Sequence, residues 1–133
     1  MISSNEIKKG DIYYAVLDPI IGSEQNGTRP VVVVQNNKGN KYSPTILVAP
    51  ITSKLNLKAN IPTHIIIKAF GRIKNDSIIL LEQVRVLDKK RLKSYLCSLN
   101  SKQIKMVDKA LISAFDISED GEVELGGAYN EKF

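Results

Sequence analysis

Few side chains in this chain of 133 residues are of the types that common catalytic centres need. There is one histidine, His64, and one cysteine, Cys97, so two histidines of one chain cannot act as an acid and base pair. A zinc site of the usual four-ligand kind also needs more ligands than these two residues supply, and we expect neither a metal nor a cofactor. Both residues lie in strand-like or alternating apolar stretches, which favours structural roles over catalytic ones.

Motifs of other enzyme classes are also missing from the sequence. It contains no Gly-x-x-x-x-Gly-Lys loop for phosphate binding, no paired-cysteine spacing and no Gly-x-Ser-x-Gly nucleophile turn. This argues against nucleotide hydrolases and esterases.

The charge is unevenly distributed along the chain. The net charge is +5, but residues 119–133 carry five acidic side chains and one lysine, so residues 1–118 carry 18 basic and 9 acidic side chains. A basic body is typical of proteins that bind a polyanion, although such surfaces also occur without one. No apolar stretch approaches the roughly 18 residues of a membrane-spanning helix, and no secretory signal precedes the body, so we expect a cytoplasmic protein.

The elements that position these side chains are predicted to be mainly strands. Runs rich in β-branched and aromatic residues predict strands over Ile12–Leu17, Pro30–Gln35, Thr45–Ile51, Thr63–Lys68 and one long bent strand over Ser77–Leu87. Polar segments over residues 20–28 and 52–61 are expected to be surface loops, and residues 36–40 a turn. Pro50 is expected to interrupt the ladder of its strand.

One helix is clearly indicated, at the C-terminal end of the body. Asn100 can cap it, Gln103 occupies the capping-box position, and an apolar stripe follows over Ile104, Val107, Leu111 and Phe115. We expect this helix to span Ser101–Asp116 and to pack on the sheet rather than enter a nucleic-acid groove. Five or more strands and one terminal helix predict a small half-open β-barrel over residues 1–117, followed by an acidic tail, residues 118–133, that is expected to fray.

Several ordered blocks of the sequence resemble one known family. These are Gly10-Asp11-Ile12-Tyr13, Asp18-Pro19, Gly22-Ser23-Glu24-Gln25, Arg29-Pro30, Val34-Gln35-Asn36 and Leu80-Leu81-Glu82-Gln83-Val84-Arg85. Together they resemble the MazF/PemK family of toxin endoribonucleases over about residues 7–117, and the run Asn40–Thr45 resembles its Gram-positive branch. Asn26, Pro50 and the acidic tail depart from the usual family pattern.

The resemblance implies a homodimer of SH3-like, CcdB-like barrels that cleaves single-stranded RNA without metal and is silenced by a MazE-like antitoxin with an acidic segment. Cleavage of RNA without metal can use the 2′-hydroxyl of the substrate, which attacks the adjacent phosphorus and leaves a 2′,3′-cyclic phosphate and a 5′-hydroxyl. The protein must then stabilise the added negative charge.

Three residues are carried over from the family as catalytic. Arg29 supplies a planar donor fork suited to phosphate oxygens, and charge stabilisation is favoured over proton donation because a guanidinium is a poor acid at neutral pH. Thr52 would hydrogen-bond the scissile phosphate and fix its position. Glu24 would either accept the 2′-hydroxyl proton or bond a base edge, or it only organises its loop.

The predicted RNA-binding residues share amide, hydroxyl or ammonium groups: Ser23, Gln25, Ser53, Lys54, Lys58 and Gln83. For Gln83 and Arg85, a solvated strand face is at least as good an interpretation. Two other functions stay open at this point, a CcdB-like toxin that poisons DNA gyrase without catalysis and a nucleic-acid-binding barrel that is not an enzyme.

Overall fold

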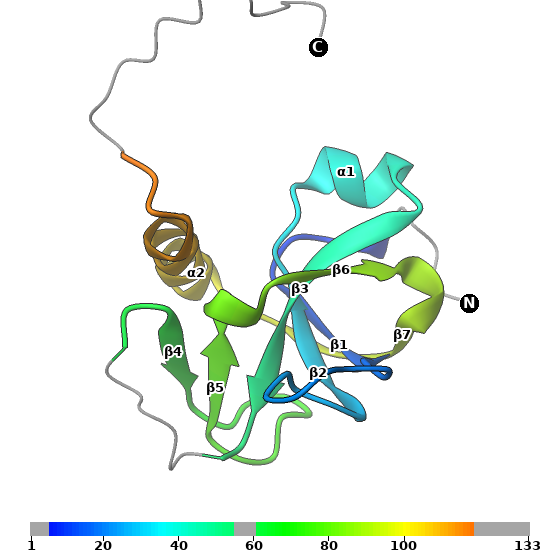
Figure 1. Ribbon diagram of the computed structural model, residues 1–133, viewed down its shortest axis with the longest axis horizontal. Coiled ribbons are helices and arrows are strands. Elements are labelled where there is room, and N and C mark those ends of the chain that lie inside the picture. The colour runs from blue at the N-terminus through cyan, green and yellow to red at the C-terminus, as the bar shows by residue number, and fades with distance from the viewer. Residues whose placement is uncertain (1–5, 55–60, 119–133) are drawn as a thin grey trace, which may run out of the picture.

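The computed structural model describes residues 6–54 and 61–118. In chain order, the elements in these ranges are β1 (Asp11–Val16), β2 (Thr28–Val33), α1 (Asn37–Tyr42), β3 (Thr45–Thr52), β4 (His64–Ile67), β5 (Ser77–Leu80), the 3₁₀ helix η2 (Leu81–Gln83), β6 (Arg85–Asp88), the 3₁₀ helix η3 (Lys89–Arg91), β7 (Leu92–Ser98) and α2 (Ser101–Phe115). The molecule is mainly β with a C-terminal helix, as the sequence predicts (Figure 1).

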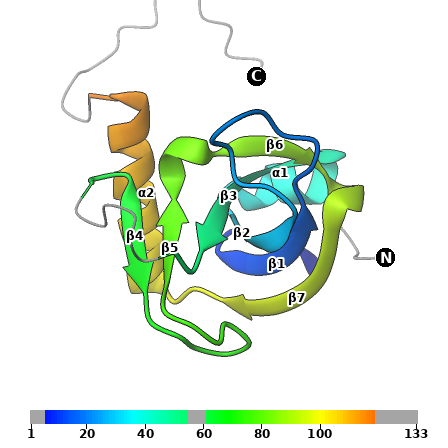
Figure 2. The ribbon, with the colours of Figure 1, turned by 60° about the horizontal axis from the view of Figure 1, so that its bottom comes forward.

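The seven strands form one antiparallel sheet in the order β4-β5-β3-β2-β1-β7, and β6 pairs with β3 beside this path. The sheet curls on itself, but β7 and β6 do not pair with each other, so the barrel stays open on that side (Figure 2). The prediction of a half-open barrel is confirmed.

Strand β3 is the centre of the sheet because it has different neighbours along its length. Its first half pairs with β6 through Val48, whereas Ile51 and Thr52 pair with β5. Pro50 lies between these two pairings, where its missing N–H removes no bond to either neighbour. The ladder on this side of β3 therefore breaks at Pro50, where the partner changes from β6 to β5, while the strand itself continues to Thr52.

Two apolar clusters lie on opposite faces of the curled sheet. Successive residues of a strand point to opposite faces, so Ile12 joins one cluster and Tyr13 the other. Strand β2 is buried on both faces in the same way, with Val32 in the first cluster and Val31 in the second. This agrees with the continuous apolar run from which it was predicted.

Helix α2 begins as predicted, with a complete capping box between Asn100 and Gln103. It packs beside β4 and η2, and Val107 is buried in the cluster it shares with the sheet. The predicted apolar stripe is wrong at Phe115, which is 62% exposed. The last turn of α2 extends past the strands that lie beside its earlier turns (Figure 2), so no strand of the described ranges covers the ring.

Two segments differ from their predicted structures. The expected turn at residues 36–40 is the start of α1, which is capped by the Asn36 side chain and fixed by Asn40, a buried residue whose amide bonds to Gln35. The expected long strand over Ser77–Leu87 is divided into β5 and β6 by η2. The short η3 and strand β7 follow β6, and β7 was not assigned from the sequence. No helix in the described ranges is long and apolar enough to span a membrane.

Candidate nucleic-acid interface

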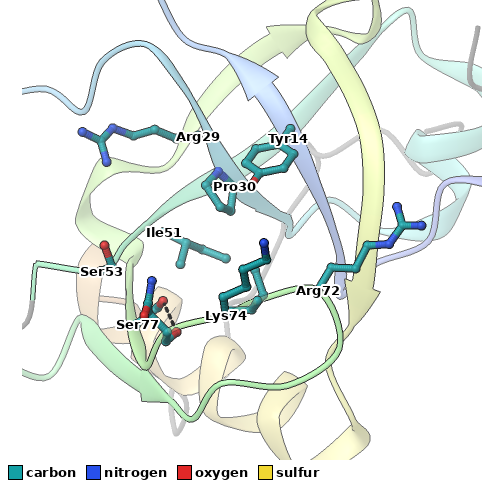
Figure 3. Close-up of a pocket in the computed structure, with 10 residues that line it drawn as sticks. Tyr14, Arg29, Pro30, Ile51, Ser53, Arg72, Lys74 and Ser77 are labelled. Atoms are coloured by element: carbon teal, nitrogen blue, oxygen red, sulfur yellow. Dashed lines mark hydrogen bonds between the residues drawn. The ribbon is translucent and has the colours of Figure 1, made fainter.

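A cavity of about 220 Å³ opens between the outward faces of β1, β2 and β3 and the segment that connects β4 to β5 (Figure 3). Its floor is formed by Pro30 and Ile51, with the ring of Tyr14 along one side. Tyr14 is paired with Pro30 across β1 and β2, and its side chain is 38% exposed. The other lining residues are polar or charged: Arg29, Ser53, Arg72, Lys74, Asn75 and Ser77, together with Ile73. We call this cavity the cationic pocket.

The cationic pocket is strongly one-sided in charge. Arg29, Arg72 and Lys74 line it, and none of its ten lining residues carries a carboxylate. In the described ranges none of these three side chains forms an ion pair. Such a pocket attracts anions, because three positive charges repel one another less when a negative group lies between them.

Arg29 is held at the edge of the cationic pocket by its own loop. It lies on β2 opposite Ala15, and its Nε donates a hydrogen bond of 2.7 Å to the backbone carbonyl of Asn26. That bond uses only Nε, so the two terminal guanidinium nitrogens can still donate. They lie on the same side of the pocket as Ser53 (Figure 3). These nitrogens can donate two parallel hydrogen bonds to phosphate oxygens.

The opposite wall is the segment 68–76. The backbones of Phe70 and Ile73 exchange two hydrogen bonds, and Ile73 is buried in the core. The Asp76 carboxylate accepts a hydrogen bond of 2.8 Å from the amide of Ala69. This bond lowers the pKa of the Asp76 carboxyl, and Lys68 nearby acts in the same direction.

Gly71 fixes this wall against β7. Its φ is +54°, a conformation that favours glycine, and a Cβ added there would lie 2.8 Å from the Cβ of Cys97. Cys97 is itself buried, as predicted from the sequence, and burial raises the pKa of its thiol. A raised pKa disfavours the reactive thiolate, which supports a structural role for this cysteine.

A second cavity of about 460 Å³ lies between the loop 17–27 and the η2–β6 segment. Gln83 fixes the loop, because its Oε1 accepts a hydrogen bond of 3.0 Å from the amide of Gln25. Glu24 also lines this cavity, and its carboxylate accepts a hydrogen bond of 2.9 Å from the amide of Ile21. The Glu24 side chain thus folds back on its own loop.

The structure separates the predicted site residues into groups. Arg29 and Ser53 line the cationic pocket, whereas Glu24, Gln25 and Gln83 line the second cavity. The remaining three predicted residues of the described ranges are Thr52, which is 1% exposed, and Ser23 and Lys54, which are exposed. Lys58 lies outside the described residues.

The structure adds detail for Thr52 and corrects one interpretation of Gln83 and Arg85. The Thr52 hydroxyl accepts a hydrogen bond of 3.2 Å from the amide of Lys54, so it shapes the chain just beyond β3. Gln83 and Arg85 do not form a solvated strand face: Gln83 belongs to η2, and the Arg85 guanidinium donates to the carbonyl of Leu17. That interpretation is wrong because η2 interrupts the strand on which it depended.

Sequence reasoning missed the residues that the segment 68–76 contributes to the pocket, above all Arg72 and Lys74. The available signal was Gly71 and the polar run Lys74-Asn75-Asp76 between two strand patterns, which marks a loop that reaches the site. In the described parts of the chain, no three histidine, cysteine, aspartate or glutamate side chains gather as metal ligands would.

The chain thus forms a small open β-barrel that carries a cationic pocket beside a structured loop. The chain belongs to the family of PemK-like, MazF-like toxins of type II toxin–antitoxin systems, whose model matches residues 8–115.

Solved structures share this fold at low sequence identity. MazF from Deinococcus radiodurans is 21% identical with a TM-score of 0.71, over 84% of this chain and 97% of that one. The Mycobacterium tuberculosis toxin MazF-mt6 is 20% identical with a TM-score of 0.68, over 81% and 98% of the two chains. A mycobacterial endoribonuclease in complex with its cognate antitoxin is 18% identical with a TM-score of 0.66, over 86% and 97%.

Proposed function

We propose that this toxin is an endoribonuclease that cleaves single-stranded RNA at a short sequence without metal, with Arg29 as the residue that stabilises the reacting phosphate. The observation that carries the proposal is the position of the Arg29 guanidinium, which is anchored through Nε and lines a pocket free of carboxylates. Family membership supports the reaction class.

The proposed reaction transfers the bond at phosphorus from the 5′-oxygen to the 2′-oxygen. The 2′-hydroxyl oxygen bonds to phosphorus and gives its proton to a water molecule, the P–O5′ bond breaks, and the leaving 5′-oxygen takes a proton from water. Negative charge grows on the nonbridging oxygens during this step, and Arg29 offers two donors in the fixed geometry that those oxygens accept. Preorganised donors of this kind contribute roughly 3–4 kcal/mol to transition-state stabilisation.

Thr52 and Glu24 act through position in this proposal. Thr52 stands directly before Ser53 of the cationic pocket, and its bond to Lys54 sets the course of the chain there. The bond from Glu24 to the Ile21 amide supports its role as an organiser of the loop that ends at Arg29, rather than as the base. We assign base contacts to Gln25 and Gln83 in the second cavity, and phosphate or sugar contacts to Ser23, Ser53, Lys54 and Lys58.

Partners follow from the family and from the charge. We propose a homodimer that is neutralised by an antitoxin whose acidic segment covers the cationic pocket, since a type II toxin pairs with a protein antitoxin. The match to a family of PemK-like and MazF-like toxins does not favour the gyrase-poison alternative. We propose residues 1–117 as the toxin domain and residues 118–133 as an appendage.

The test incubates the toxin with a long mixed-sequence RNA in EDTA and maps every new 5′ end together with its chemical state. We expect discrete cuts with 5′-hydroxyl ends. Arg29→Ala should lower the cleavage rate by about a hundredfold or more, the size of a lost charge stabiliser. Lys93→Ala, an exposed lysine on β7 outside the pocket, is the matched control and should cleave normally. Intact RNA with the wild type, or normal cleavage by Arg29→Ala, would overturn the proposal.

A further inference from the structure

We infer that Lys74 and Arg72 bind backbone phosphates of the RNA that flank the scissile one, so that the segment 68–76 forms the second wall of the RNA-binding surface. This inference rests on the proposed function and adds two residues to it. Neither residue belongs to the sequence blocks from which the function was predicted, and both were found through the geometry of the cationic pocket.

The three cations follow one another across the cationic pocket. Figure 3 shows the Arg29 guanidinium on one side, the Lys74 ammonium reaching over the middle of the pocket, and Arg72 on the far side. A strand with one negative charge per nucleotide can meet such a series with successive phosphates. A single small anion would need only one of the three.

Among the residues that the structure describes, no carboxylate forms an ion pair with either of these two side chains. The nearest acid in sequence, Asp76, is engaged elsewhere: one carboxylate oxygen accepts from the Ala69 amide, and the other lies 3.6 Å from the Lys68 ammonium. Arg72 donates to the backbone carbonyl of Tyr95 at 3.4 Å, a long bond that orients the guanidinium without neutralising it. Their positive charges are therefore available to an external anion.

The wall that carries them is held in place before any ligand arrives. Gly71 is seated against Cys97, Ile73 is buried, and the Phe70–Ile73 backbone pair closes the segment between them. Arg72 and Lys74 flank the buried Ile73 and start from fixed backbone positions. Preorganisation of this kind reduces the entropy lost when a ligand is bound.

The floor between the cations suits the rest of a nucleotide. Tyr14 is 38% exposed and lies beside Pro30, giving an aromatic and apolar surface under the path of the backbone. Unstacked bases of single-stranded RNA bind such rings, and the exposed Asn75 adds an amide group to the lining of the pocket. A flexible single strand fits this combination.

The experiment measures binding of an RNA oligonucleotide that contains a mapped cleavage site made uncleavable by one 2′-deoxy substitution. Fluorescence anisotropy at several salt concentrations gives the slope of log K against log salt. Each phosphate contact to a single strand contributes about 0.7 to the magnitude of that slope. Lys74→Ala and Arg72→Ala should each reduce it by about 0.7 and raise KM, whereas kcat and the position of the cut stay unchanged.

Lys74→Arg should restore the slope, and the exposed Lys93→Ala should keep the wild-type value. Unchanged slopes in both alanine variants, or a fall in kcat with KM unchanged, would overturn the inference. The proposed function is judged separately: it fails if Arg29→Ala still cleaves RNA, and the inference fails if Arg29→Ala is inactive while Lys74→Ala and Arg72→Ala bind as the wild type does.

Discussion

Gly71→Ala is the substitution that tests most sharply how the second wall of the cationic pocket is built. The residue has φ +54°, and its added Cβ would approach the Cβ of Cys97 to 2.8 Å. The left-handed conformation costs an L residue roughly 1–2 kcal/mol. Relieving the contact costs about 1–3 kcal/mol more, because Cys97 is buried in β7 and the strand cannot easily give way.

Gly22→Ala is the matched control for this experiment. Gly22 has φ +58°, close to that of Gly71, but nothing lies within 4 Å of the Cβ that alanine would add. Urea unfolding of both variants at one protein concentration should show the free energy of unfolding lowered by roughly 2–5 kcal/mol for Gly71→Ala and by about 1–2 kcal/mol for Gly22→Ala. The difference between them isolates the contact with Cys97.

The same variant links stability to function. If the loop rather than the strand moves to relieve the contact, Arg72 and Lys74 are displaced, and RNA affinity should fall in the folded Gly71→Ala protein. The claim that Gly71 fixes this wall would be refuted if Gly71→Ala were as stable as Gly22→Ala and bound RNA with the affinity of the wild type.

Three further predictions concern other parts of the fold. Burial raises the pKa of Tyr13 to about 12, and Asp11 adds to the effect. The neutral phenol therefore stabilises the folded state below pH 10, and this contribution is lost as the pH rises from 10 to 12. The difference in absorbance at 295 nm between the wild type and Tyr13→Phe should show this late titration, and a midpoint near pH 10 would contradict it. Gln83→Ala removes the acceptor of the Gln25 amide, so hydrogen exchange at that amide should accelerate, and unchanged exchange would show that the bond does not hold the loop. Asn100→Ala should lower the free energy of unfolding by about 1 kcal/mol, because α2 loses its N-cap. Asn36→Ala removes the N-cap of the short α1 and allows the same measurement there.

The regular parts of the fold could be predicted from local sequence patterns. The continuous valines of β2 and the capping box of α2 are signals contained within a few neighbouring residues, and both elements are present. The short helix α1 was not predicted, because its formation depends on the buried Asn40 and its bonds to Gln35, which only the folded chain brings together. The break between β5 and β6 likewise gives β3 two successive partners, a tertiary requirement that alternation does not encode.

The candidate site could be predicted only in part for the same reason. Arg29 was found because it stands in a sequence block that resembles a family, and the structure places it in the cationic pocket. Arg72 and Lys74 lie more than 40 residues further along the chain, and only the curl of the sheet brings their segment opposite β2. Basic residues in a loop are otherwise common on surfaces, so their type alone gave no reason to select them.

Removal of one 2′-hydroxyl from the substrate tests most directly the claim that this hydroxyl attacks the scissile phosphate. Once a cleavage site is mapped, two oligonucleotides that differ only in the 2′-hydroxyl next to the scissile phosphate are incubated with the wild-type toxin in EDTA. The account predicts that both bind with similar affinity and that only the ribose form is cut, to a 2′,3′-cyclic phosphate and a 5′-hydroxyl. Cleavage of the deoxy form, or binding of the ribose form without cleavage, would contradict it.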